Sequence, residues 1–252
     1  MKKESKKILN LILPFISVLS IILIWAIASK IVNNFSLLPS ITLTLKSFIK
    51  LFTYGEFYIS FAFTVLRSLI AFVCSFAIAF FVALLSSLSE MFKRAFSPVI
   101  SVIRVLPTIA VVLLLLVWTN SFVAPVIVVM LVVFPNLVVS LETAFSAVDK
   151  EQIEMCKLFG VDEKTLIYRV KIPQMLPLIV EAIGSNLSLS LKLMVAAEVL
   201  SYTSQSLGNY LYLSKLYDNT ATMMALVMVT VITGMILEKI FKNLSKKFGD
   251  WR

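Results

Sequence analysis

The chain has 252 residues, 60% of them hydrophobic, with a formal net charge of +9 and a mean hydropathy of +0.97. Soluble domains are only about 45–50% apolar, so this composition excludes an ordinary soluble domain and predicts an all-α membrane protein. In such a protein the excess lysine and arginine is expected on the loops that orient the spans, and no nucleic-acid partner is expected. The sequence has no histidine and no CxxC pair, so no metal site is predicted.

Six membrane spans are predicted from the uncharged stretches. A span needs about 20 apolar residues, because a hydrocarbon layer of ~30 Å is crossed at ~1.5 Å per residue. The uncharged run 105–141 is too long for one span, and its only polar break, 119–121, is predicted to be a tight turn. The first run follows four lysines but is too long for a signal peptide, so it is predicted to be retained. The predicted spans are 8–29, about 60–89, about 98–119, about 121–141, about 176–197 and about 219–237.

The distribution of positive charge predicts the orientation of these spans. With six spans, both termini lie on the same side of the membrane. The tails and loops on that side carry sixteen lysine and arginine residues, and those on the other side carry four. Because positively charged loops stay inside, both termini are predicted to be cytoplasmic.

A polar segment, 149–173, interrupts the apolar spans and carries ten charged residues. Asp149 is a candidate N-cap of a short helix, with Gln152 in the capping-box position. Gly160 suits the left-handed position that ends this helix, and Asp162 can cap a second short helix. Pro173 is predicted to end the second helix and turn the chain back into the bilayer. This pattern predicts a rigid cytoplasmic elbow, although an ordinary interfacial amphipathic helix would have the same local pattern.

The spacing within the elbow resembles the EAA loop of permease subunits of binding-protein-dependent ABC transporters. Identical matches are Glu154, Gly160 and Pro173, conservative matches are Val170 and Ile172, and Met155 and Cys156 stand where the family has two alanines. In that family the elbow is a coupling helix that docks on a cytoplasmic ATPase subunit. The resemblance implies the same role for these five matching residues.

Two further segments resemble the sulfonate/nitrate/taurine branch of that family. They are Arg104-x2-Pro107-x2-Ala110, leading to Trp118, and Ala196-Ala197-Glu198, leading to Gly208. Together with the elbow, the resemblance covers roughly residues 10–252.

This resemblance implies a fold like that of type I ABC importer permeases, in a bacterial inner membrane. We expect an N-terminal tail, first span and external loop over 1–58, and a five-span core over 59–252. The expected partners are an ATPase subunit, an extracytoplasmic solute-binding protein and a second permease copy in a homodimer. The chain lacks the GxxxxGK[ST] phosphate-binding pattern, so ATP is expected to be bound by the partner, without a cofactor or an enzymatic activity in this chain. The solute is expected to be small, either anionic or a vitamin precursor.

Charged residues within or near the spans are candidates for the translocation pathway, because a charge in the bilayer is costly and needs a reason. The candidates are Arg104, Pro107, Lys192 and Glu198. Each charge also has a simpler interpretation. Lys192 could extend to the outer headgroups, Arg104 could pair with a lipid phosphate, and Glu198 could anchor an outer loop.

Two other function classes compete with an ABC permease. An ion-coupled secondary transporter or channel usually has internal repeats or acidic residues deep in its spans, and neither is evident here. A membrane enzyme would need catalytic groups, but the sequence has no histidine and no cluster of carboxylates within a span.

Overall fold

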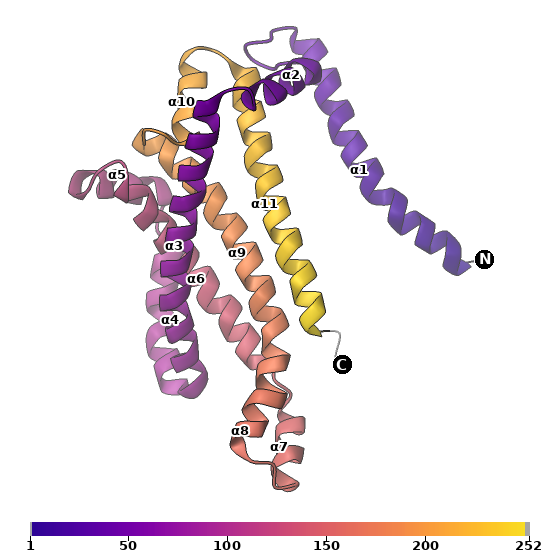
Figure 1. The fold of residues 1–252 in the computed structure, drawn as a ribbon, viewed down its shortest axis with the longest axis vertical. Helices are drawn as coiled ribbons and strands as arrows, with labels where there is room; N and C mark the ends of the chain where they lie inside the picture. The colour runs from indigo at the N-terminus through magenta and orange to yellow at the C-terminus, as the bar shows by residue number, and fades with distance from the viewer. Residues whose placement is uncertain (1, 250–252) are drawn as a thin grey trace. The chain divides into compact units, whose positions relative to one another are not determined.

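The computed structural model describes residues 2–249, and its regular structure within that range is entirely helical (Figure 1). This confirms the all-α prediction. The helices are α1 (Lys2–Val32), α2 (Ile41–Leu51), α3 (Gly55–Leu88), α4 (Glu90–Val105), α5 (Thr108–Trp118), α6 (Val123–Ser146), α7 (Lys150–Leu158), α8 (Glu163–Leu166), the π-helix η1 (Ile167–Lys171), α9 (Ile172–Ser201), α10 (Leu207–Leu216) and α11 (Thr220–Gly249).

The chain divides into two compact units. The first comprises Met1–Phe57 and Leu211–Val229, and the second comprises Tyr58–Tyr210 and Thr230–Arg252. In the first unit, the Trp25 indole N–H donates to the Pro39 carbonyl at 3.2 Å and closes the turn between α1 and α2. The second unit holds the elbow and all the predicted site residues. The expected functional division into 1–58 and 59–252 remains a prediction.

Four segments in the described part of the chain are long and apolar enough to cross a membrane. They are α3, α6, the continuous stretch Glu163–Ser201 and α11, and α4 with α5 makes a possible fifth span bent by 90°. The predicted first span falls in α1, but the side chains of residues 2–12, 14 and 15 lie outside the described set. Six spans therefore remain a prediction.

The predicted third span, about 98–119, is bent by 90° in the structure. It is divided between α4 and α5, and the chain turns at Leu106 and Pro107. A residue before proline is forced out of the helical region, and Leu106 accordingly has an extended ψ of 127°. The turn after this span is confirmed, because Asn120 Oδ1 accepts the backbone N–H groups of Phe122 and Val123, at 3.0 Å each, just before α6.

The core of the second unit forms where α3, α6 and α9 meet. Its buried side chains include Ala71, Phe72, Val133, Leu137, Leu187 and Met194. Serine hydroxyls join the helices: Ser75 Oγ donates to the Met130 carbonyl at 3.0 Å, and Ser190 Oγ donates to the Ser68 carbonyl at 2.8 Å. The small polar residues of α9 therefore contribute to helix packing.

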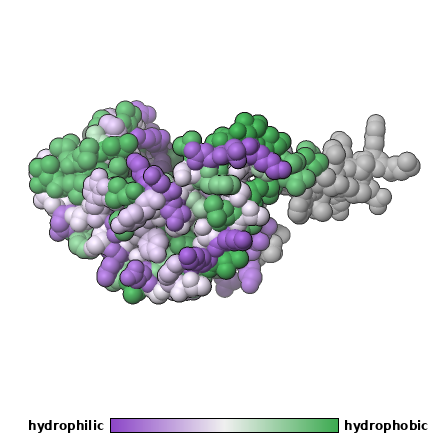
Figure 2. Space-filling view, turned by 90° about the horizontal axis from the view of Figure 1, so that it is seen from above, coloured by the Kyte–Doolittle hydropathy of each residue, from purple (hydrophilic) through white to green (hydrophobic). Residues whose placement is uncertain are grey.

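The outer surface of the helices is strongly apolar, as expected for contact with lipid. On α3, for example, Val73 is 54% exposed and Phe81 is 65% exposed. The view from above, in contrast, shows hydrophilic side chains among hydrophobic ones (Figure 2). The hydrophilic side chains on this face need water or another polar partner to hydrogen-bond them.

Candidate functional site

The first helix of the elbow, α7, is capped at both ends as predicted. Asp149 Oδ1 accepts the backbone N–H of Glu151 at 2.9 Å. At the other end, the Gly160 N–H donates to the Lys157 carbonyl and the Val161 N–H donates to the Cys156 carbonyl, each at 3.0 Å. These two bonds form a Schellman motif, and Gly160 has the left-handed φ of +72° that this motif requires.

We predict that Gly160→Val destabilises the elbow by about 1–2 kcal/mol, because a β-branched residue avoids positive φ. The cost is purely one of backbone strain, since a Cβ at this position would meet nothing within 4 Å. Gly160→Asn is the matched control, because asparagine tolerates the left-handed region. Limited proteolysis of the membrane-inserted protein measures the effect. Equal cleavage of the valine and asparagine variants would contradict the prediction.

The second half of the elbow departs from the prediction at Pro173. Asp162 caps α8 by accepting the Thr165 N–H at 3.1 Å. Hydrogen bonds from the Thr165 side chain and, to a lesser extent, the Thr165 backbone N–H lower the pKa of the exposed Asp162 carboxyl.

Pro173, however, does not end a helix. It lies in the first turn of α9, directly after η1.

The helical path continues through this proline because the preceding turn is wide. A proline ring clashes with the carbonyl four residues earlier in a regular α-helix. That residue here, Arg169, belongs to η1, where hydrogen bonds span five residues, as from the Ile172 N–H to the Ile167 carbonyl. The elbow and the membrane helix α9 are therefore joined by a continuous helical segment.

Gln174, which the sequence patterns did not single out, ties the two ends of the elbow together. This residue is buried. Its Oε1 accepts the Asp149 N–H at 2.9 Å, and its Nε2 donates to Gln152 Oε1 at 2.7 Å. Gln152 was predicted to complete a capping box by accepting the Asp149 N–H. Gln174 accepts that N–H instead, and Gln152 accepts a hydrogen bond from Gln174. The first turn of α7 is thereby fixed to the first turn of α9.

The elbow exposes large apolar side chains. Met155, Leu158 and Phe159, which we call the elbow patch, are 52%, 87% and 82% exposed. Their spacing of three and four residues puts them on one face of the helix. Tyr168 on η1 is also 70% exposed. Exposed apolar patches of this kind occur where a protein contacts a partner or a membrane.

The other predicted elbow residues contribute differently. Glu154 is exposed on α7, next to the elbow patch. Val170 is half-buried in η1, and Ile172 is 36% exposed at the start of α9. The elbow therefore presents Glu154 to solvent, whereas Val170 and Ile172 lie where the elbow joins the membrane helix.

Glu198 is fully buried in a cluster of polar partners. Its Oε1 lies 2.8 Å from Nη1 of Arg67 on α3, and its Oε2 accepts the Thr64 hydroxyl at 2.8 Å. The Arg67 guanidinium also lies over the rings of Phe63 and Phe122, 5.6 Å from each centroid. This geometry favours the anchoring interpretation of Glu198, because its carboxylate faces α3 and not an open surface.

Gly208 completes this cluster. Its N–H donates to Glu198 Oε2 at 3.3 Å. A Cβ here would lie 2.4 Å from the Cβ of Glu198 and 2.6 Å from the Val199 backbone nitrogen. Glycine is therefore required for the start of α10 to approach the end of α9 this closely, which explains the Glu198-to-Gly208 pattern noted in the sequence.

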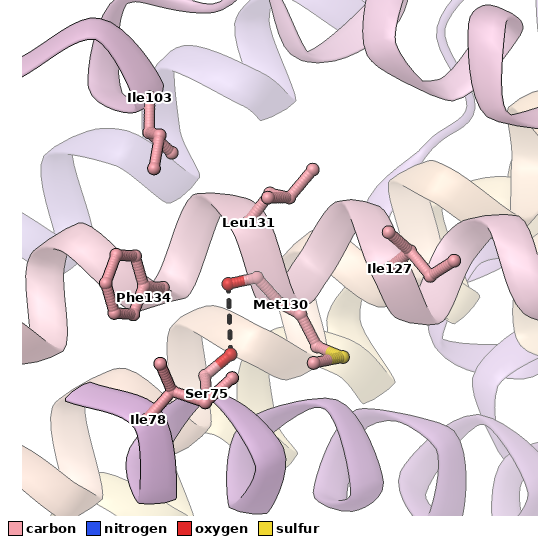
Figure 3. Close-up of a pocket in the computed structure, with 7 residues that line it drawn as sticks. All are labelled: Ser75, Ile78, Ile103, Ile127, Met130, Leu131 and Phe134. Atoms are coloured by element: carbon pink, nitrogen blue, oxygen red, sulfur yellow. Dashed lines mark hydrogen bonds between the residues drawn. The ribbon is translucent and has the colours of Figure 1, made fainter. Parts of the chain in front are cut away.

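Arg104 and Pro107 lie at the bend between α4 and α5, and both are exposed. An apolar cavity of about 260 Å³ lies beside Ile103 (Figure 3). It is lined by Ser75, Ile78, Ile103, Ile127, Met130, Leu131 and Phe134. The one hydroxyl in this lining, that of Ser75, already donates to the Met130 carbonyl. The cavity therefore offers no charged group to a solute.

Lys192 pairs with Glu238 of α11, which the sequence patterns did not single out. The Lys192 Nζ lies 3.7 Å from Glu238 Oε1, and both side chains are about half exposed. In the described part of the chain, the four predicted pathway residues thus do not form one cluster. Glu198 is buried against α3, Lys192 pairs with α11, and Arg104 and Pro107 mark the bend.

Known proteins resemble this chain in sequence. Residues 75–249 match the family model described as "Binding-protein-dependent transport system inner membrane component". A probable ABC transporter permease protein of Brucella abortus (strain 2308) is 24% identical over 187 residues, which cover 74% of each chain. A putative aliphatic sulfonates transport permease protein of Bacillus subtilis (strain 168) is 21% identical over 245 residues, covering 96% of this chain and 87% of the relative.

Solved structures show the same fold. One is the methionine ABC transporter in an inward-facing conformation, with a TM-score of 0.63, 16% identity and coverage of 74% of this chain and 93% of that one. Another is a bacterial alginate ABC transporter in complex with a periplasmic protein that holds an alginate pentasaccharide. Its TM-score is 0.64 at 14% identity, and the match covers 98% of this chain and 96% of that one.

Proposed function

Because this chain belongs to the family of binding-protein-dependent transport system inner membrane components, we propose that its elbow, 149–173, is the surface through which an ATPase subunit drives it. The observation that carries this proposal is the elbow patch. Leu158 and Phe159 are more than four-fifths exposed on a segment rich in charged residues, and an apolar groove on a partner would remove them from water.

The family assignment establishes the general role. The chain is a permease component of an ABC transport system in the inner membrane, and ATP hydrolysis belongs to a separate partner subunit. Its partners are an ATPase and a solute-binding protein. This decides against the ion-coupled secondary transporter or channel considered above, because the energy comes from another chain.

The contacts of the elbow support the transmission of force from α7 to the membrane helix α9. Gln174 fixes the start of α7 to the start of α9, and the helical path from Glu163 to Ser201 is continuous. A displacement of α7 would therefore be transmitted to α9, because no flexible loop lies between Gln174 and the rest of α9. Coupling requires that the contacts differ in energy between two states of the transporter.

The finer assembly is also part of the proposal. The chain acts as a homodimer with two ATPase subunits on its cytoplasmic side, and the segment 201–218 lies near the solute-binding protein on the other side. The alginate transporter, which was solved with a periplasmic protein, supports this arrangement by its similar fold. The solute is small, and either anionic or a vitamin precursor. The name of the Bacillus subtilis relative, an aliphatic sulfonates permease, supports an anionic group.

Both termini are proposed to be cytoplasmic, on the sixteen-to-four charge bias. Single cysteines at Ser5 and Asn243, in a chain whose Cys74 and Cys156 are replaced by serine, should resist membrane-impermeant thiol reagents in intact cells. They should react once the membrane is opened. Labelling of either position from outside the cell would disprove this topology.

The coupling role is tested by Glu154→Lys in a complex reconstituted with its ATPase and solute-binding protein. The exposed carboxylate lies beside the elbow patch, so reversing its charge should lower both transport and the stimulated ATPase activity at least tenfold. Glu90→Lys is the matched control, because Glu90 is exposed on α4, outside the elbow. If Glu154→Lys keeps normal stimulated hydrolysis and transport, the elbow does not couple the subunits.

A further inference from the structure

The ion pair between Lys192 and Glu238 has no role in the elbow or in the packing core. The Lys192 Nζ lies 3.7 Å from Glu238 Oε1, and the two side chains are 51% and 48% exposed. They come from α9 and α11, two helices long and apolar enough to span a membrane, and both residues belong to the second compact unit. An exposed pair of opposite charges on two spans needs a physical explanation.

Three contacts determine how α9 and α11 run past each other. Ser245 Oγ donates to the Pro177 carbonyl at 2.8 Å. About two turns further along α9, a Cβ on Gly184 would lie 2.4 Å from the Phe241 Cβ, and one turn beyond that a Cβ on Gly234 would meet Ser188. Residue numbers rise on one helix while they fall on the other, so the helices are antiparallel.

This arrangement gives the depth of the ion pair. Lys192 lies nine residues before the end of α9 at Ser201, and Glu238 lies eighteen residues after the start of α11 at Thr220. At about 1.5 Å per residue, these separations are about 14 Å and 27 Å. In a hydrocarbon layer of about 30 Å that begins at these helix ends, the Lys192 backbone lies near the middle of the layer, and its side chain reaches toward Glu238 in the inner part of the layer. Lys192 points toward Glu238 and not toward the outer headgroups.

A surface that exposes two charges at this depth is unsuited to lipid. Charged residues within spans face a protein interior or a water-filled cavity. The close approach of the helices also depends on a small residue, because a Cβ on Gly234 would lie 2.7 Å from Ser188 Oγ and 3.4 Å from Lys192 Cε. The Ser188 hydroxyl is itself buried and has no hydrogen-bond partner among the described residues.

We infer that the Lys192–Glu238 pair lines the translocation pathway as a net-neutral polar site, suited to small solutes that carry both a positive and a negative group. This inference rests on the proposed function and narrows its solute class to solutes whose anionic group is accompanied by a positive one. An anion that took Lys192 alone would leave Glu238 without its partner, which is costly away from bulk water. The negative group of a solute with both charges can pair with Lys192 while its positive group pairs with Glu238, so neither residue is left without a partner.

The test uses a reporter cysteine beside the intact pair, in a chain whose Cys74 and Cys156 are replaced by serine. Met235 is 63% exposed and three residues from Glu238, so Met235→Cys lies on the same side of α11. Ile236 is 52% exposed but faces about 160° away from Glu238, so Ile236→Cys is the matched control. The complete transporter in membrane vesicles is treated with an anionic and a cationic methanethiosulfonate reagent.

We expect Met235→Cys to react with both reagents at similar rates, and Ile236→Cys to remain unlabelled. Adding Lys192→Met should shift the ratio of rates about tenfold toward the cationic reagent, and adding Glu238→Gln should shift it about tenfold toward the anionic one. Rescue of the balanced ratio by exchanging the two residues, Lys192→Glu with Glu238→Lys, would support the pair as the cause.

An unlabelled Met235→Cys would overturn the inference, because the pair would not face water. A strong preference for the anionic reagent with the pair intact would overturn the net-neutral site, and unchanged ratios in the two neutralised variants would overturn the role of the pair. The assay reads water access and local charge, and does not use the elbow. Its failure is therefore distinct from a failure of Glu154→Lys to uncouple the subunits.

Discussion

Replacing Leu158 and Phe159 together with aspartate should release the ATPase subunit from this permease while leaving its membrane helices folded. Leu158 at the end of α7 and Phe159 directly after it are 87% and 82% exposed, so the change removes little packing within the chain. In the complex they are expected to fill an apolar groove, where a carboxylate would lose its water without gaining a partner. Loss of a central apolar contact costs about 2 kcal/mol or more, roughly 30-fold in Kd for each residue.

Co-purification of the permease with its ATPase in detergent, followed by a binding titration, measures this effect. The matched control is Leu158→Met with Phe159→Leu, which keeps the elbow patch apolar and should retain binding within a few fold. Normal size-exclusion behaviour of the aspartate variant shows that the fold survives. Retention of the ATPase at the wild-type ratio by the aspartate variant would show that the elbow patch is not the contact.

Arg67→Met should destabilise the second compact unit by about 3–5 kcal/mol, because it leaves the fully buried carboxylate of Glu198 without its cation. The hydrogen bonds from Thr64 and Gly208 remain, but they cannot neutralise the charge. Adding Glu198→Gln removes that charge and keeps an acceptor for both donors. The double variant should therefore recover at least about half of the lost stability.

Thermal unfolding of the purified protein in detergent compares the wild type, the single variant and the double variant. Arg94→Met is a suitable control, because Arg94 forms an exposed ion pair with Glu90, and exposed pairs contribute little. If the double variant proves less stable than Arg67→Met alone, the charge of Glu198 is not what makes the single substitution costly.

Local chemistry made the elbow largely predictable from the sequence. The caps at Asp149 and Asp162 and the left-handed turn at Gly160 depend on residues close in the chain, and all three were confirmed. Pro173 was misinterpreted because its effect depends on the turn before it. A proline stops a regular α-helix, but the wide turn of η1 lets it stand in the first turn of α9.

The pairings between distant residues could not be predicted from spacing alone. Arg67 and Glu198 are separated by 131 positions, and only the packing of α3 against α9 brings them together. Lys192 was considered without Glu238, since the sequence does not show which faces of two antiparallel helices meet. A useful signal was present in both cases: opposite charges within or near apolar spans, each too costly to remain unpaired.

A photo-crosslinking amino acid at position 159 provides the most direct measurement of the coupling role proposed for the elbow. It is introduced in place of Phe159 in the complete transporter with its ATPase, and the same amino acid in place of Leu88, which is 75% exposed at the end of α3, is the control. We predict an adduct between position 159 and the ATPase subunit, and none from position 88. Adducts from position 159 with lipid only, in a complex that still hydrolyses ATP, would contradict the account.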